Sequence, residues 1–217
     1  MEFKTLNVYA ICITLFFSLI LSGCVKDNPE TPEEITETFL YSFQKKDYDK
    51  TNSFLAGESE YFNYIILNTS EQAEYIKSIL SKNMEYKIIN SEITDSLNAR
   101  VNVEISNINM QNEMSKILSD LFEYGNEQFA AGKSSNDIDF NSKIIELLED
   151  RLENNTPETI SKTIEISFIK GNNGNWEIVT DTNIFDAITG GYVSFSQRLQ
   201  SSLNIYTDEN DINNLDE

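Results

Sequence analysis

The sequence predicts an α+β domain in which N-terminal helices pack on a curved, cone-like antiparallel sheet of about four strands. Apolar residues recur at helical spacing near the start, in the middle and at the end of the chain. Two segments between them alternate strictly between apolar and polar residues. Such alternation indicates a sheet with one buried and one wet face, which favours antiparallel strands. Helices that cover one face of such a sheet make an α+β architecture.

The first predicted helix has a clear start signal. Thr31 can cap it, Pro32 suits its first position, and Glu34 completes a capping box. The residues that follow at helical spacing are apolar: Ile35, Phe39, Leu40 and Phe43. A turn and a second short helix are expected within 45–55, and a third helix after Thr69 or Ser70, either of which can cap it.

Two hairpins are predicted after these helices. The first joins 85–88 to the clearest strand, 97–105, through a turn at 94–96. The second joins 160–168 to 176–180 through the Gly171–Gly174 turn, a strong hairpin signal. The alternation places Trp176, the only tryptophan, toward the core.

A two-helix insert is predicted between the hairpins, over 111–155. Its first helix carries one apolar stripe made of Met114, Ile117, Leu118, Leu121, Phe122 and Phe129. Its second helix carries Ile144, Ile145, Leu148 and Leu152. The insert either extends the core or forms a lid or partner surface, and the sequence does not decide between these alternatives.

A C-terminal helix closes the domain. Its apolar residues are Ile188, Tyr192, Phe195, Leu199 and Leu203, and Gly190–Gly191 is expected to kink or cap it. The acidic segment 206–217 is predicted to be a flexible, solvated tail. No glycine- or proline-rich linker divides 32–205, which is therefore predicted to be a single domain.

The N-terminus carries a secretory signal. Val8–Leu21 is an uncharged apolar run, too short for a membrane span of roughly 20 residues. Small residues follow at Ser22 and Gly23, as at a signal cleavage site. Residues 1–23 are therefore predicted to be a signal peptide.

Composition excludes several classes of function. The formal net charge is −20, so no basic patch is available to neutralise nucleic-acid phosphates. The chain has no histidine, which removes histidine-dependent nucleophilic catalysis and the usual ligands of zinc and copper. Of its two cysteines, Cys12 lies in the leader. No cofactor is predicted, and any metal would be a hard cation held by oxygens.

Leu21-Ser22-Gly23-Cys24 resembles the lipobox of bacterial lipoproteins. The resemblance implies cleavage between Gly23 and Cys24 and a diacylglyceryl group on the Cys24 sulfur. Residues 24–31 would then be a lipidated tether, and the membrane would be a partner through the lipid anchor. The implied location is the extracytoplasmic face of the cell membrane.

Three further stretches resemble the nuclear-transport-factor-like, cystatin-like fold of small Gram-positive lipoproteins of unknown function. They are the opening helix pair (31–55), the last strand "NWEIVTD" (175–181) and "IFDAITGG" (184–191). In that fold the sheet curls around a pocket, and its enzymes use a carboxylate and tyrosines there. The insert is longer than a plain cone fold needs.

These observations favour a non-catalytic binding or accessory lipoprotein whose partner is an envelope protein or a small ligand. The alternative is an enzyme with a buried carboxylate beside a tyrosine in a ketosteroid-isomerase-like pocket. A weaker alternative is calcium binding, because Asp137, Asp139 and Asn141 begin like a calcium loop. The loop pattern then fails, and Asn136 or Asp137 is expected to cap the following helix. The aromatic run 60–67 is expected to be core rather than pocket lining.

Overall fold

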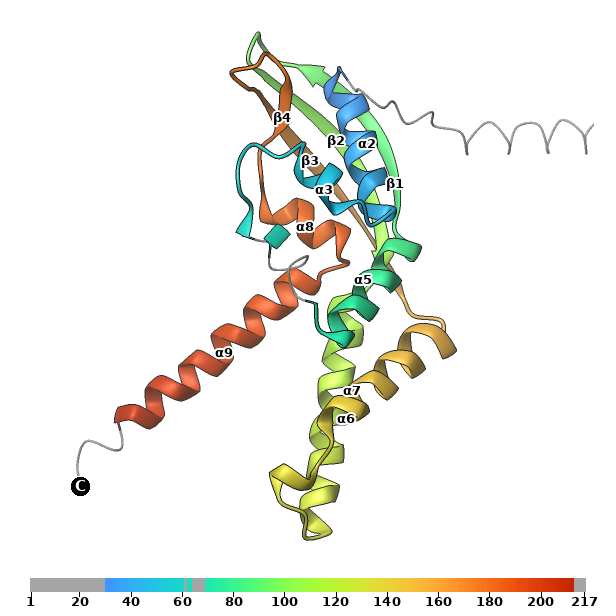
Figure 1. Cartoon of the computed structure of the whole chain (residues 1–217), viewed down its shortest axis with the longest axis vertical. Helices are drawn as coiled ribbons and strands as arrows, with labels where there is room; N and C mark the ends of the chain where they lie inside the picture. Colours follow the sequence, from blue (N-terminus) through green and yellow to red (C-terminus); the bar gives the residue numbers. More distant parts are fainter. Residues whose placement is uncertain (1–29, 61, 64–68, 213–217) are drawn as a thin grey trace, which may run out of the picture.

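A four-stranded antiparallel sheet forms the upper half of the protein as drawn in Figure 1, together with the helices that cover it. The computed structural model describes residues 30–60, 62–63 and 69–212. The strands are neighbours in chain order: β1 (Glu85–Ile93), β2 (Asn98–Ile108), β3 (Thr159–Lys170) and β4 (Trp176–Ile178). Together with the helices described below, this arrangement confirms the α+β class, the two hairpins and the number of strands.

The sheet has one apolar and one polar face, as the alternation predicted. Val101 of β2 lies opposite Ile166 of β3, and both side chains are fully buried. The neighbouring pair on the other face, Asn102 and Glu165, is polar. A one-residue slip would exchange the two faces, so the apolar pattern specifies this register.

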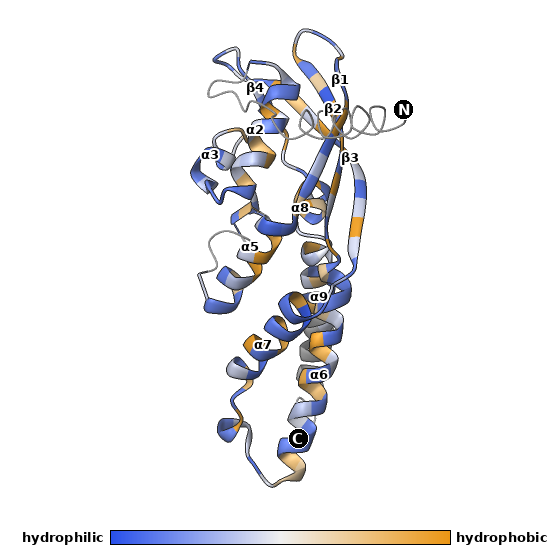
Figure 2. Cartoon of the chain, turned by 90° about the vertical axis from the view of Figure 1, so that its right-hand side faces the viewer, coloured by the Kyte–Doolittle hydropathy of each residue, from blue (hydrophilic) through white to orange (hydrophobic). Residues whose placement is uncertain are grey.

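Helices α2 (Pro32–Gln44), α3 (Tyr48–Asn52), α5 (Glu71–Asn83) and α8 (Thr182–Ile188) accompany the sheet. Figure 2 shows α2, α3 and α5 on one side of the strands. The largest fully buried side chains between helices and sheet, each less than 2% exposed, are Phe39, Phe43, Phe168 and Phe185. We call the sheet and these four helices the sheet body.

The predicted start of the first helix is confirmed atom by atom. The Thr31 hydroxyl accepts the Glu34 amide at 3.2 Å, and the Glu34 carboxylate accepts the Thr31 amide at 3.3 Å. Ser70 caps α5 by accepting the Ala73 amide at 3.3 Å. Trp176 is buried in the core, as expected.

The insert forms a helical hairpin, which we call the arm. It comprises α6 (Met110–Ala130), a 3₁₀ turn η1 (Ser135–Asp137), α7 (Phe140–Glu149) and a single π-helical turn η2 (Asp150–Asn154). The arm extends from the end of the sheet opposite the β1–β2 turn (Figure 1). Its base joins α5 in a second apolar cluster: Ile76, Ile79, Leu80, Ile108, Met110, Ile117, Leu148 and Leu152.

The predicted apolar stripe of α6 is only partly used. Ile117 is buried, whereas Phe122 is 67% and Phe129 is 49% exposed. The stripe is therefore buried beside the sheet body and exposed farther along α6, so the insert extends the core only in part. The physical reason is length: α6 runs on beyond the sheet body, and α7 covers a different side of it.

Two glycines end α8 and set the direction of α9 (Tyr192–Ile212). Gly190 and Gly191 have positive φ values of +58° and +88°. The Gly191 amide donates to the Asp186 carbonyl at 2.8 Å, which closes α8. The predicted break at Gly190–Gly191 is confirmed, and α9 continues into the segment expected to be a tail.

Candidate functional site

The space where the cone-fold resemblance implies a pocket is occupied by side chains. Phe39 and Phe43 of α2 meet Phe168 of β3 and Phe185 of α8 in the core. Phe62, the one described aromatic residue of the 60–67 run, packs against Phe185 with ring centroids 6.1 Å apart. Phe62 is core, as expected, whereas Tyr61 and residues 64–67 of the run lie outside the described residues.

Asp186 is a buried carboxylate at the junction of sheet and helices. It accepts the Lys162 ammonium at 2.6 Å and the Ser194 amide at 2.8 Å. Burial by itself would raise the pKa of Asp186, but these hydrogen bonds and the Lys162 charge outweigh it and lower the pKa. The carboxylate therefore stays ionised and ties β3 to α8 and the start of α9. A general acid would need the opposite shift.

Glu113, near the start of α6, is the other buried carboxylate among the described residues. It accepts the Lys116 ammonium at 2.8 Å, so its partner is a lysine on the same helix rather than a tyrosine.

The arrangement nearest to a carboxylate–tyrosine pair is at Tyr75. Burial, followed by the charges of Glu153 and Glu149, raises the pKa of Tyr75 to about 12. Both glutamates are exposed. This arrangement thus lacks the buried carboxyl group that the enzyme hypothesis requires.

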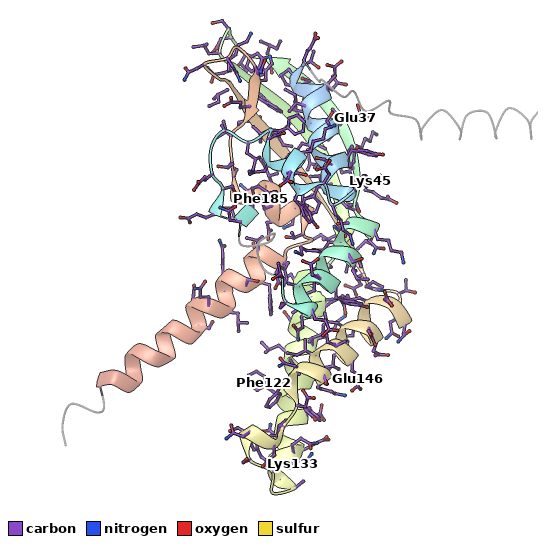
Figure 3. All side chains as sticks on the ribbon, viewed as in Figure 1. Glu37, Lys45, Phe122, Lys133, Glu146 and Phe185 are labelled. Atoms are coloured by element: carbon purple, nitrogen blue, oxygen red, sulfur yellow. The ribbon has the colours of Figure 1, made fainter. Side chains whose placement is uncertain are left out.

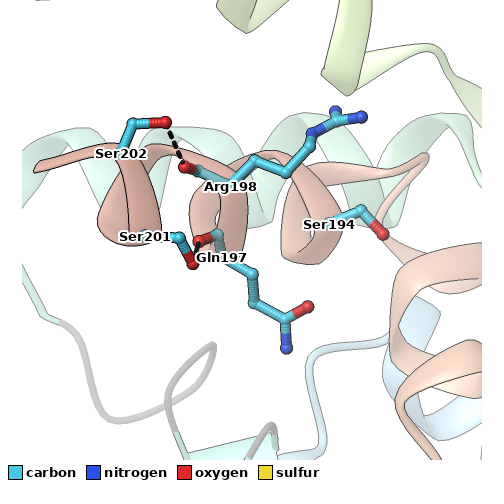
Figure 4. A pocket seen from close by; sticks show the side chains of 5 residues that line it. All are labelled: Ser194, Gln197, Arg198, Ser201 and Ser202. Atoms are coloured by element: carbon cyan, nitrogen blue, oxygen red, sulfur yellow. Dashed lines mark hydrogen bonds between the residues drawn. The ribbon is translucent and has the colours of Figure 1, made fainter. Parts of the chain in front are cut away.

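A groove of about 510 Å³ lies along α9, lined by Ser194, Gln197, Arg198, Ser201 and Ser202 (Figure 4). The hydroxyls of Ser201 and Ser202 donate back to helix carbonyls at 2.8 Å. Both hydroxyl donors are therefore already used within the helix. Arg198 is the charged residue in the lining of the groove.

A second hollow, of about 270 Å³, lies at the polar face of the sheet. Its lining is Glu165, Ser167, Val179, Thr180, Asp181 and Thr182. Asp181 accepts the Asn183 amide at 2.9 Å as the cap of α8. Its carboxylate therefore has a structural role.

The arm carries the two most exposed phenylalanines of the described residues, Phe122 and Phe129. Gly125 of α6 lies against Phe140 of α7, and Tyr124 meets the same ring edge-on at 6.1 Å. Arg151 donates to Asp120 across the hairpin. These contacts hold the two helices together on one flank, while Figure 3 shows Phe122 on the other flank, away from Glu146 of α7.

The segment that begins like a calcium loop is engaged in local turns. Asp139 accepts the Ser142 amide at 3.0 Å and caps α7. Asp137 accepts the Ser134 hydroxyl at 2.6 Å. The expectation that Asn136 or Asp137 caps this helix is therefore wrong by two or three positions. Within 30–60, 62–63 and 69–212, no three acidic, histidine or cysteine side chains gather as a metal site requires.

The predicted lipidation and cleavage residues, Cys24 and Gly23, lie outside the described residues. None of the helices in the described ranges combines the length and apolar composition needed to cross a bilayer.

Sequence reasoning missed the two polar side chains that organise the junction, Asp186 and Asn107. The Asn107 amide donates to Leu80 O at 3.2 Å and to Ile188 O at 2.7 Å, which joins β2 to α5 and α8. Asn107 continues the alternation of the inner face one step beyond Ile105, so its position in the pattern was the available signal. Asp186 lies in the short segment before Gly190, and nothing in the sequence pattern there distinguishes it from the other acidic residues.

No protein-family profile matches the chain, and no curated protein matches it significantly. A solved structure that resembles it is the proposed lipoprotein ycdA of Bacillus subtilis subsp. subtilis str. 168, with 16% identity and a TM-score of 0.37. The match covers 81% of this chain and 54% of that one, so the chain spans about half the length of its neighbour. The similarity is too low to assign the chain to a family.

Proposed function

We propose that the protein is a lipid-anchored lipoprotein of the extracytoplasmic membrane face that acts by binding rather than by catalysis. The observation that carries the anchor is Cys24, placed directly after Leu21-Ser22-Gly23 and an uncharged apolar run. A diacylated cysteine supplies two acyl chains, and two chains anchor a protein stably where one does not.

The binding role is supported by the way the described side chains are used. The inner face of the sheet is packed with core residues, and the buried carboxylate Asp186 is held by Lys162. The exposed phenylalanines lie instead on the arm, at Phe122 and Phe129. Aromatic residues are enriched at protein interfaces, so the arm is the surface that we propose presents the domain to an envelope protein.

The anchor is tested by Cys24→Ala in cells. We expect the substitution to abolish incorporation of radiolabelled palmitate and to move the protein from the membrane fraction to the soluble fraction. Cys12→Ala is the matched control, because Cys12 lies in the leader and its loss leaves the acceptor thiol intact. A Cys24→Ala protein that stays with membranes as wild type does would contradict the anchor.

The binding role is tested with the arm. A Phe122→Ser/Phe129→Ser variant is compared with wild type in cross-linking to envelope proteins in intact cells. We expect the double variant to lose a specific cross-linked product that wild type forms. Ile89→Ser, which removes an exposed apolar side chain from the sheet body, is the control. Identical products from all three proteins would contradict a binding role for the arm.

A further inference from the structure

The start of α2 and the β1–β2 turn lie at the same end of the molecule (Figure 1). The Gln44 amide donates to the Met84 carbonyl at 2.5 Å, and the Tyr86 hydroxyl donates to the Glu37 carbonyl at 3.4 Å. The end of α2 is thus level with the start of β1, so the two elements run antiparallel. The chain that enters α2 therefore comes from the side of the β1–β2 turn.

The β1–β2 turn projects beyond the start of α2. From Tyr86 to Ile93, β1 advances about 20 Å at ~3.3 Å per residue, because the bulge between Ile88 and Asn90 takes up one of the seven steps. From Glu37 back to Thr31, α2 covers only about 9 Å at ~1.5 Å per residue. The contact between Gln44 and Met84 gives a somewhat smaller difference by the same arithmetic, so the turn overhangs the first helix by about 7–11 Å.

The predicted tether is long enough to span this overhang, but it is too short to let the domain move far from the bilayer. Residues 24–29 precede the described chain, and the path from Cys24 to Glu30 spans at most about 21 Å at ~3.5 Å per residue. A lipid on Cys24 therefore keeps Glu30 within that distance of the bilayer. The overhang takes up about a third to a half of this reach, so with the turn directed toward the bilayer the β1–β2 turn lies within about 14 Å of the membrane surface and can contact it.

The overhanging turn carries two strongly exposed aliphatic side chains. Ile93 is 62% and Leu97 is 60% exposed. They are the two most exposed large aliphatic side chains in the described part of the chain. They flank Asp95, whose carboxylate accepts the amides of Leu97 at 2.7 Å and Asn98 at 2.9 Å. The neighbouring β3–β4 turn, 171–175, carries no charge. The loop 94–97 between the two strands carries one charge, Asp95, and Glu92 beside the loop is paired with Arg100.

We infer that the β1–β2 turn, through Ile93 and Leu97, rests on the outer surface of the bilayer that holds the Cys24 lipid. The inference rests on the proposed lipid anchor. It orients the domain: the arm, at the opposite end of the molecule, points away from the membrane (Figure 1). The exposed Phe122 and Phe129 are then presented to the envelope and kept clear of the lipid.

The test uses the mature chain from Cys24, whose one thiol is coupled to a maleimide phospholipid in phosphatidylcholine vesicles. Leu97→Trp and Ile93→Trp report on the turn, and Phe122→Trp is the control, because Phe122 is about as exposed as Leu97. Vesicles with bromine on the upper acyl chain quench a tryptophan that contacts lipid. The emission of buried Trp176 is measured in the unsubstituted protein and subtracted.

We expect bromine quenching and a shift to shorter wavelength at position 97 or 93, with emission at position 122 unchanged. Equal quenching at positions 97 and 122, quenching at 122 alone, or quenching at none of the three overturns the orientation. Thermal unfolding of each variant confirms that it is folded. The coupled lipid supplies the anchor chemically, so this result is independent of acylation in cells, which the Cys24→Ala experiment tests separately.

Discussion

Phe185 in the sheet body and Phe122 in the arm both lie on helices with an apolar stripe, yet one is fully buried and the other is 67% exposed. The sheet body has a face of β2 and β3 against which Phe185 packs. The distal half of α6 packs against α7 through Gly125 and Tyr124, on another flank than Phe122. A periodic apolar stripe therefore shows where a partner fits, and the fold decides whether the partner is part of the chain.

The largest effect is expected from truncating these two phenylalanines. Phe185→Ala removes a core ring and leaves a cavity, which costs about 3–5 kcal/mol of unfolding free energy. Phe122→Ala removes an exposed ring and is expected to stay within about 0.5 kcal/mol of wild type. Urea unfolding of the two variants measures both values. Similar losses for both variants would show that the arm is as closely packed as the sheet body.

The next effect concerns the junction between α8 and α9. A Cβ on Gly190 would lie 1.8 Å from the Ile108 carbonyl oxygen, and its φ is +58°. Gly190→Ala is expected to cost about 2–5 kcal/mol, since left-handed strain of about 1–2 adds to overpacking of about 1–3 kcal/mol. Gly57 also has a positive φ, of +89°, but nothing within 4 Å of such a Cβ.

Gly57→Ala is therefore the matched control and is expected to cost only the backbone strain of about 1–2 kcal/mol. Equal losses at the two glycines would show that the contact with β2 is not what requires a glycine at position 190. Thermal unfolding followed by circular dichroism is sufficient for this comparison.

A smaller effect is expected from the carboxylate that ties β3 to α8 and α9. Asp186→Asn is expected to cost about 2 kcal/mol near neutral pH, since it weakens hydrogen bonds made by a charged group. The lowered pKa of Asp186 makes its contribution fully present above the ordinary carboxyl value of 3.8. The contribution is lost as the pH falls through the lower pKa of the folded state.

Wild type should therefore lose more stability than Asp186→Asn between neutral pH and a pH of about 3. Urea unfolding at several pH values measures this difference. Parallel pH profiles for the two proteins would show that Asp186 does not titrate with a lowered pKa.

The smallest effect separates capping from calcium binding in the arm. Asp139→Ala removes the cap of α7 and is expected to cost about 1 kcal/mol. If Asp139 acts only as a cap, millimolar calcium leaves the melting temperature of wild type unchanged, and calorimetry detects no binding heat. A calcium-dependent rise in melting temperature that disappears in Asp139→Ala would favour the calcium alternative.

Much of the sheet body was predictable because its signals are local. The cap at Thr31, the alternation of β2 and the Gly171–Gly174 turn each depend on a few neighbouring residues, and the structure confirms them. The break at Gly190–Gly191 was equally visible.

The remaining features depend on contacts between distant segments. The exposure of Phe122 follows from how far α6 extends beyond the sheet, which periodicity does not encode. The pairing of Asp186 with Lys162 joins β3 to α8, and neither residue stands out in the acidic sequence. The predicted cap of α7 differs from the observed one because three neighbouring residues, Asn136, Asp137 and Asp139, are all good caps.

The anchor at Cys24 is the central claim, and intact-mass spectrometry of the protein purified from its natural membrane tests it most directly. The account predicts a chain that begins at Cys24 and carries the added mass of a diacylglyceryl group. A chain that retains residues 1–23, or one that begins at Cys24 with an unmodified thiol, would contradict it.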